Sequence, residues 1–236
     1  MERKRLATGI GGLDVLLEGG LPEGKTYLVT GDPGGGKSLF CTHFLLKGLE
    51  DGERAVYVAI DETPAEIVEQ AESLGLPLAQ YVDRKALLIL DASTHFSSRM
   101  GREKEIDVQR VIVDLGSYVK RMEASRIVID SAGPLILLRD AASRIQDQAR
   151  RLIFALQTQL KTTNLLTCYP VPRTGEKAEH AVEEYLVAGV IALRLKKTAG
   201  GWTRTLAVEK MRATATDLAE HEFAIVKGRG IVLKPV

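Results

Sequence analysis

Gly31-Asp32-Pro33-Gly34-Gly35-Gly36-Lys37-Ser38 is the stretch that decides the fold, because it fits the pattern G-x-x-x-x-G-K-[ST] at every fixed position. An apolar, β-prone run at 26–30 precedes it, and residues 39–46 read as a buried helix. A glycine-rich loop between a strand and a helix can turn successive backbone N–H groups toward a phosphate. These eight residues, with Leu39 at the start of the helix, therefore predict a phosphate-binding loop.

Two further residue types are expected to complete this site. Lys37 is placed to reach the β- and γ-phosphates of a nucleotide, and the Ser38 hydroxyl is placed to ligate Mg²⁺. Downstream, Asp130 ends the short apolar strand predicted at 126–131, which is the pattern of a Walker B element. Asp130 is therefore expected to hold the Mg²⁺ through its coordination shell.

The composition is that of a globular protein without stabilising crosslinks. The chain has 236 residues, of which 45% are hydrophobic and 27% charged, so it can bury a sizeable core. Its net charge of +1 carries no overall signature of nucleic-acid binding. Cys41 and Cys168 are isolated and read as core residues. Without an apolar leader or a span of about 20 apolar residues, we expect one cytoplasmic domain that does not enter a membrane.

The order of predicted elements indicates the α/β class. Strands are expected after the loop helix at 55–60, 86–90, 126–131 and 164–168, and helices at 63–74, 108–122 and 140–162, with a polar loop at 94–107. The pattern then changes to β-prone runs at 187–197, 202–211, 223–226 and 230–233. Alternating strands and helices followed by terminal strands predict a mostly parallel central sheet with C-terminal antiparallel strands.

The residues around the loop resemble a known family. The order T-G-I-x-G-L-D-x-L-L-x-G-G-L-P-x-G at 8–24, followed by the phosphate loop, resembles the opening of the KaiC-like branch of the RecA ATPase superfamily. The resemblance extends from Arg5 to Leu233 and includes V-E-E-Y-L-V-A-G-V-I at 182–191. It implies a RecA-like P-loop three-layer sandwich, present here as one copy of a unit that two-domain members duplicate.

The resemblance also implies a catalytic carboxylate. In the family, the strand after the loop helix ends in two glutamates followed by Ser/Thr-Pro, and a carboxylate of that pair polarises the attacking water. Here Asp61-Glu62 precedes Thr63-Pro64. The first acid is one methylene shorter, so either residue can be the base and hydrolysis is expected to be slow. Alternatively, both acids only complement the helix dipole.

A second departure concerns the sensor of the terminal phosphate. RecA-like ATPases usually place Gln or Glu just past the strand predicted here at 164–168. This chain has Cys168-Tyr169-Pro170 instead, which leaves Thr167 as a possible hydrogen-bond donor. The side chain that usually senses the terminal phosphate is therefore missing from this position.

A third group lies near the C-terminus. Residues 210–214, K-M-R-A-T, resemble the K-M-R-G-T motif of the family, with Ala213 in place of glycine. In relatives, the Lys and Arg reach across a subunit boundary to the neighbour's γ-phosphate. The resemblance therefore implies that Lys210 and Arg212 act between subunits of a homo-oligomeric ring, a hexamer by analogy.

Three functions remain open at this stage. The first is a Mg²⁺-dependent KaiC-like ATPase, a ring that binds ATP, hydrolyses it slowly and regulates an unidentified partner protein. The second is a RecA- or RadA-like DNA recombination or repair ATPase, which the neutral charge and the few aromatic residues do not favour. The third is a nucleotide-gated scaffold that does not hydrolyse ATP, which Asp61 and the missing sensor would explain.

Overall fold

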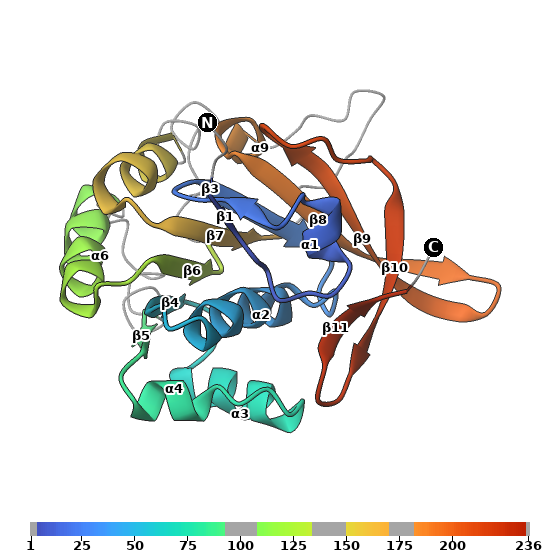
Figure 1. Ribbon diagram of the computed structural model, residues 1–236, viewed down its shortest axis with the longest axis horizontal. Helices are drawn as coiled ribbons and strands as arrows, with labels where there is room; N and C mark the ends of the chain where they lie inside the picture. Colours follow the sequence, from blue (N-terminus) through green and yellow to red (C-terminus); the bar gives the residue numbers. More distant parts are fainter. Residues whose placement is uncertain (1–3, 93–107, 134–149, 170–181, 235–236) are drawn as a thin grey trace, which may run out of the picture.

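The computed structural model describes residues 4–92, 108–133, 150–169 and 182–234 of the chain (Figure 1). The loop predicted at 94–107, the first part of the helix predicted at 140–162, and Pro170 lie outside these ranges.

A nine-stranded sheet forms the centre of the molecule, in the order β11-β10-β9-β8-β3-β7-β6-β4-β5. Its strands are β3 (Thr26–Gly31), β4 (Ala55–Ala59), β5 (Leu87–Asp91), β6 (Arg126–Asp130), β7 (Thr163–Cys168), β8 (Gly189–Thr198), β9 (Gly201–Met211), β10 (Glu220–Val226) and β11 (Gly230–Leu233). The six strands from β8 to β5 are parallel, and β9, β10 and β11 continue the sheet in antiparallel order. The predicted α/β class and the C-terminal antiparallel strands are confirmed.

Helices cover both faces of this sheet, as Figure 1 shows. They are α1 (Leu13–Leu16), α2 (Lys37–Glu50), α3 (Pro64–Ser73), α4 (Ala79–Asp83), α6 (Val108–Met122), the π-helix η1 (Leu156–Leu160) and α9 (Val182–Leu186). Residues 150–155 are α-helical and lead directly into η1. Near the N-terminus, β1 (Arg5–Leu6) and β2 (Leu21–Pro22) form a separate two-stranded sheet.

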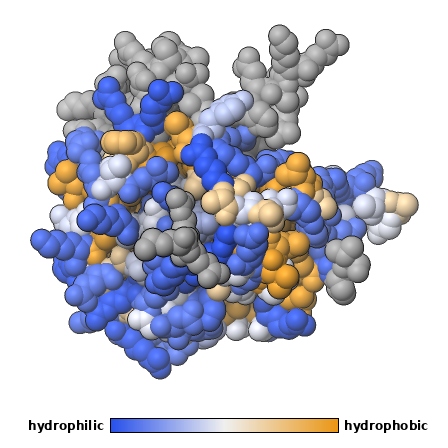
Figure 2. All heavy atoms as spheres, turned by 45° about the horizontal axis from the view of Figure 1, so that its top comes forward, coloured by the Kyte–Doolittle hydropathy of each residue, from blue (hydrophilic) through white to orange (hydrophobic). Residues whose placement is uncertain are grey.

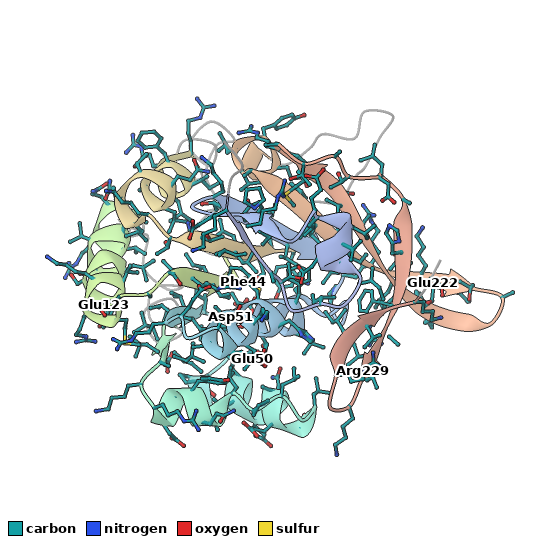
Figure 3. All side chains as sticks on the ribbon, in the orientation of Figure 1. Phe44, Glu50, Asp51, Glu123, Glu222 and Arg229 are labelled. Atoms are coloured by element: carbon teal, nitrogen blue, oxygen red, sulfur yellow. The ribbon has the colours of Figure 1, made fainter. Side chains whose placement is uncertain are left out.

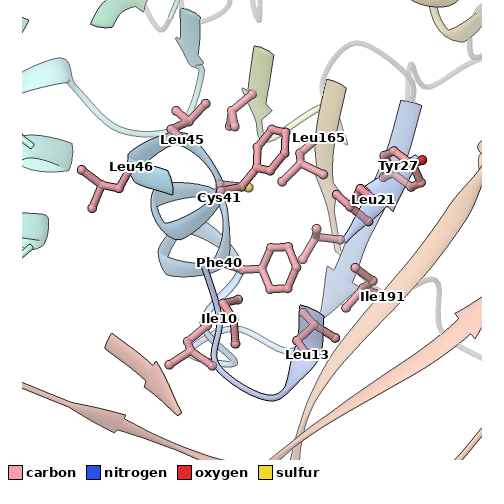
Figure 4. Packing of buried hydrophobic residues seen from close by; sticks show 14 of the residues in the cluster. Ile10, Leu13, Leu21, Tyr27, Phe40, Cys41, Leu45, Leu46, Leu165 and Ile191 are labelled. Atoms are coloured by element: carbon pink, nitrogen blue, oxygen red, sulfur yellow. The ribbon is translucent and has the colours of Figure 1, made fainter. Parts of the chain in front are cut away.

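Two apolar clusters fill the space between the sheet and its helix layers. Neighbouring strand residues fall into different clusters: Tyr57 belongs to the one that contains α2 and α3 residues, and Val56 to the one that contains α6 residues. Because successive side chains of a strand point to opposite faces, the sheet is covered on both sides. Figure 4 shows Phe40 and Cys41 of α2 facing the strand that carries Leu165.

Several predicted details are confirmed and others are wrong. Thr63 caps α3 in a capping box with Glu66, as its sequence predicts. Both cysteines are buried, and neither forms a disulfide. The helix after the loop begins at Lys37, two residues earlier than predicted, because the loop leads into the first turn without an intervening residue. The helix predicted to end at 162 closes as the π-helix η1, while α4 and α9 are too short for periodicity to reveal.

The face of the molecule shown in Figure 2 is mostly polar. Figure 2 shows hydrophilic side chains over most of one face, with apolar residues gathered in a few patches. Within the described ranges, no helix is both long and apolar enough to cross a lipid bilayer.

His43 joins the loop helix to the C-terminal hairpin. Its Nε2 atom accepts a hydrogen bond of 2.9 Å from the backbone N–H of Ile231 on β11. The approach requires a glycine next to it, since a Cβ atom on Gly230 would lie 2.0 Å from the same nitrogen. Burial lowers the pKa of His43 below its ordinary value of 6.5, although a backbone hydrogen bond with Gly9 opposes the shift. The imidazole is therefore neutral when it accepts from Ile231.

This contact predicts a loss of stability in mild acid. Because the folded-state pKa of His43 is depressed, the unfolded chain binds the proton first, so stability is full above about pH 6.5 and falls as the pH drops below it. We expect urea midpoints measured between about pH 6.5 and 5.5 to decline in the wild type and to decline less in His43→Gln. Equal slopes in the two proteins would contradict this assignment.

Candidate functional site

The phosphate loop lies between the end of β3 and the start of α2, where the parallel strands end. Gly31 approaches β8 so closely that a Cβ atom on it would lie 1.8 Å from the carbonyl oxygen of Leu193. Gly34 and Gly36 have φ values of 75° and 104°, in the left-handed region that glycine adopts without strain. Glycine is therefore required at Gly31 by the close contact with β8, and at Gly34 and Gly36 by the left-handed backbone conformation.

The loop is fastened to the β8–β9 hairpin by hydrogen bonds. The backbone N–H of Asp32 donates to the Leu193 carbonyl at 3.0 Å, and Asp32 Oδ2 accepts from the N–H of Leu195 at 2.8 Å. Arg204 on β9 donates from Nε to the carbonyl of Gly34 at 3.2 Å. Asp32, whose position the loop pattern leaves open, thus anchors the loop to the neighbouring strand.

Helix α2 points its amino end into the loop. Its N-cap residue is Gly36 and no side chain caps it, so its first N–H groups and its positive dipole end face the loop. Lys37 Nζ donates to the carbonyls of Gly31 and Asp32 at 2.8 and 3.1 Å. Burial lowers the pKa of Lys37, and the nearby carboxylates of Asp130 and Asp32 oppose that shift. This arrangement is suited to an anion.

Asp130 lies at the end of β6 with both carboxylate oxygens fixed. Tyr57 on β4 donates from its hydroxyl to Oδ2 at 2.6 Å, and Thr167 on β7 donates from Oγ1 to Oδ1. Burial raises the pKa of the Tyr57 phenol well above its usual range, and the Asp130 carboxylate adds to the shift. The phenol therefore remains a hydrogen-bond donor. The carboxylate is held by a hydroxyl from the strand on each side.

The two candidate bases point in different directions. Ser131, which follows Asp130, donates from Oγ to Asp61 Oδ2 at 2.6 Å. Glu62 instead accepts from Gln70 Nε2 on α3 at 3.0 Å. Asp61 is thus directed toward the end of β6, while Glu62 is directed along α3.

The donors present fit Mg²⁺ only in company with a nucleotide. Among the described residues, no group of three or more His, Cys, Asp or Glu side chains could hold a metal ion. Ser38 and Asp130 supply one hydroxyl and one carboxylate, and oxygen ligands are those that Mg²⁺ prefers. Phosphate oxygens and water would have to supply the remaining ligands. The metal would therefore bind together with the phosphates and polarise them.

Lys210 and Arg212 lie far from the loop of their own chain. Met211 pairs with Gly189 on β8, and Gly189 pairs with Tyr27, near the start of β3. The loop follows the other end of β3, roughly 13 Å away at 3.3 Å per residue. Lys210 Nζ donates to the Tyr185 carbonyl at 3.0 Å and Arg212 Nη2 to the same oxygen at 2.9 Å. Both cations therefore lie at the opposite edge of the sheet, against α9.

Sequence patterns missed the side chains that orient the acids. Tyr57, Ser131 and Gln70 belong to no motif, although Tyr57 is a polar-tipped residue in a strand that reads as fully buried. The sequence signal for this contact is a tyrosine within an apolar strand, whose buried hydroxyl needs a hydrogen-bond partner.

Comparison with known proteins gives consistent matches. The sequence profile of the family described as "ATPase: KaiC" matches residues 6–236. A UPF0273 protein of Thermotoga maritima is 34% identical over 242 residues, covering 98% of this chain and 96% of that protein. The circadian clock oscillator protein KaiC of Synechococcus elongatus is 34% identical over 235 residues, covering 98% of this chain but 44% of that protein.

A solved structure also resembles the chain throughout. The crystal structure of a KaiC-like protein from Pyrococcus horikoshii has a TM-score of 0.83 and 29% sequence identity, covering 99% of this chain and 100% of that one. The chain therefore spans nearly the full length of single-unit relatives and less than half of the KaiC clock protein.

The Tyr57 contact predicts a specific effect on metal dependence. Tyr57→Phe removes the hydrogen bond that fixes one oxygen of Asp130, so the carboxylate is less well oriented for Mg²⁺. We expect the Mg²⁺ concentration that half-saturates nucleotide binding to rise about tenfold, the value of one hydrogen bond to a charged group. Titrating Mg²⁺ against a fluorescent ATP analogue measures it. Tyr27→Phe is the matched control, since its buried hydroxyl donates at 2.6 Å to the backbone carbonyl of Pro22. A shift of equal size in both variants would refute the role of Tyr57.

Ala213 predicts a gain in stability on substitution by glycine. Its φ of 57° places an alanine in the left-handed region. That conformation costs an L-residue about 1–2 kcal/mol, and the added freedom of the unfolded glycine chain offsets part of the gain. We expect Ala213→Gly to raise the free energy of unfolding by about 0.5–1 kcal/mol in chemical denaturation. A decrease would show that relief of the left-handed backbone does not govern stability at this position.

Proposed function

Because the chain belongs to the KaiC family of ATPases, we propose that it is a Mg²⁺-dependent ATPase whose active sites are completed between neighbouring subunits of a ring. One observation carries the shared-site proposal: Lys210 and Arg212 lie at the edge of the sheet opposite their own loop. Two cations so placed can meet a terminal phosphate only in another copy of the chain.

Within one subunit, each group of the loop has a distinct role. The glycine-rich loop and the uncapped start of α2 bind the phosphates of ATP, with Asp32 and Pro33 shaping the loop, Gly35 within it and Leu39 in the first helical turn. Lys37 exchanges its loop carbonyl partners for the β- and γ-phosphates. Ser38 and Asp130 would hold Mg²⁺, and a bound Mg²⁺ would supply positive charge to the phosphates.

Asp61 is the acid that we assign as the base. Its carboxylate is turned toward the end of β6 by Ser131, whereas Glu62 is bound to Gln70 on α3. Proton abstraction needs hydrogen-bond reach to the attacking water, and aspartate is one methylene shorter than glutamate. Slow hydrolysis is therefore expected, which suits a ring that acts as a timer for a partner protein.

The ring requires a contact that differs on its two sides. The face with the loop meets the face with Lys210 and Arg212 of the next subunit, which is a heterologous contact and closes only as a ring. Six subunits are expected by analogy with the family. Each site then combines a loop from one subunit with two cations from its neighbour, and those cations stabilise the charge of the transition state.

A mixing experiment tests the shared site. Lys37→Met disables the loop, and Lys210→Ala with Arg212→Ala disables the cations, so each variant alone should lose roughly a hundredfold or more in ATP hydrolysis per subunit. Randomly mixed one to one, about a quarter of the sites pair an intact loop with intact cations. Activity should therefore return to about a quarter of the wild-type rate and rise with protein concentration.

The matched control is the pair Lys227→Ala with Arg229→Ala, which has the same spacing and lies at the turn between β10 and β11, where Figure 3 shows Arg229. It should keep the wild-type rate. Failure of the mixture to recover activity, with both variants folded and assembled, would refute the shared site. Stimulation by single-stranded DNA would instead favour a DNA-acting role.

A further inference from the structure

Tyr169 stands where β7 leaves the sheet, next to the phosphate loop. Cys168, the residue before it, pairs with Thr30 at the end of β3. The Tyr169 ring faces the ammonium group of Lys37, with Nζ 5.1 Å from the ring centroid, which is a cation–π distance. The Tyr169 side chain is 49% exposed, so it lies at the surface beside the loop and does not belong to the core.

The acids of the site lie near the same side chain. Burial raises the pKa of the Tyr169 phenol, and the carboxylates of Asp61, Asp130 and Glu62 raise it further. The phenol is therefore neutral and can donate a hydrogen bond.

We propose that Tyr169 reads the terminal phosphate of a bound nucleoside triphosphate, its ring packing on Lys37 and its hydroxyl donating to a γ-phosphate oxygen. This inference rests on the proposed nucleotide site. Tyr169 takes the place of the Gln or Glu that the family resemblance leads one to expect, and its phenol supplies a hydrogen-bond donor, as a Gln amide would.

The geometry separates this role from base stacking. Lys37 is the residue that meets the terminal phosphates, and the ring that packs on it lies at the phosphate end of the site. A triphosphate adds oxygens beside Lys37 that a diphosphate lacks, and these are the acceptors that the hydroxyl would meet. Tyr169 therefore strengthens triphosphate binding over diphosphate binding, while a base-stacking residue would strengthen both equally.

Two dissociation constants test the inference. The affinities of the non-hydrolysable triphosphate adenylyl imidodiphosphate and of ADP, each with Mg²⁺, are measured by calorimetry on the wild type and on Tyr169→Phe. The phenylalanine keeps the ring over Lys37 and removes the donor, so triphosphate affinity should fall about tenfold, as for one hydrogen bond to a charged group, and ADP affinity should not change.

The matched control is Tyr118→Phe, because the Tyr118 ring lies 5.0 Å from the guanidinium of Arg121 on α6, away from the loop. It should change neither affinity, and thermal unfolding checks that both variants fold. Equal losses for the two nucleotides, or no loss in Tyr169→Phe, would overturn the inference.

The outcomes also separate this inference from the ATPase proposal. A wild type that binds no nucleotide would overturn both. A wild type that binds but does not turn over, combined with a selective loss of triphosphate affinity in Tyr169→Phe, would refute the ATPase and support the role of Tyr169.

Discussion

The close approach of Gly31 to the Leu193 carbonyl is the constraint on which the site depends. Only a glycine leaves room for that carbonyl, and the same oxygen accepts the N–H of Asp32. Because Asp32 also binds the N–H of Leu195, the first two loop residues are fixed to β8 before the glycines turn toward α2. The loop is thus shaped by a strand that follows it by more than 150 residues.

The β8–β9 hairpin contacts the loop and also carries the two C-terminal cations. β8 holds the loop at one edge of the sheet, and β9 carries Lys210 and Arg212 back to the opposite edge, where both cations bind carbonyls of α9. Cross-strand pairs join β8 and β9 from Gly189 to Gly201, with a register shift between Val190 and Ile191, beside Lys210. In the proposed ring, the same hairpin would link the loop of one site to the cations of the next.

The sequence predicts what is local and misses what depends on distant contacts. The loop, the capping box of Thr63 and the acid at Asp130 follow from neighbouring residues, and each lies where it was expected. The Tyr57 and Ser131 contacts join separate strands whose order no local pattern specifies. The π-helix η1 is likewise invisible to a 3.6-residue period, because its residues satisfy the same apolar spacing as an α-helix.

In the proposed site, Asp61 stands where the family resemblance leads one to expect a glutamate. A glutamate reaches farther than an aspartate, but it also has more rotamers to fix. Here Asp61 is held by Ser131, which follows β6, and Asp130 by Tyr57 and Thr167 of the neighbouring strands, so hydroxyl groups orient two acids of the proposed site. If Asp61 is the base, as proposed, a short and fixed carboxylate would limit how far it can follow a moving water, and this restriction would favour slow turnover.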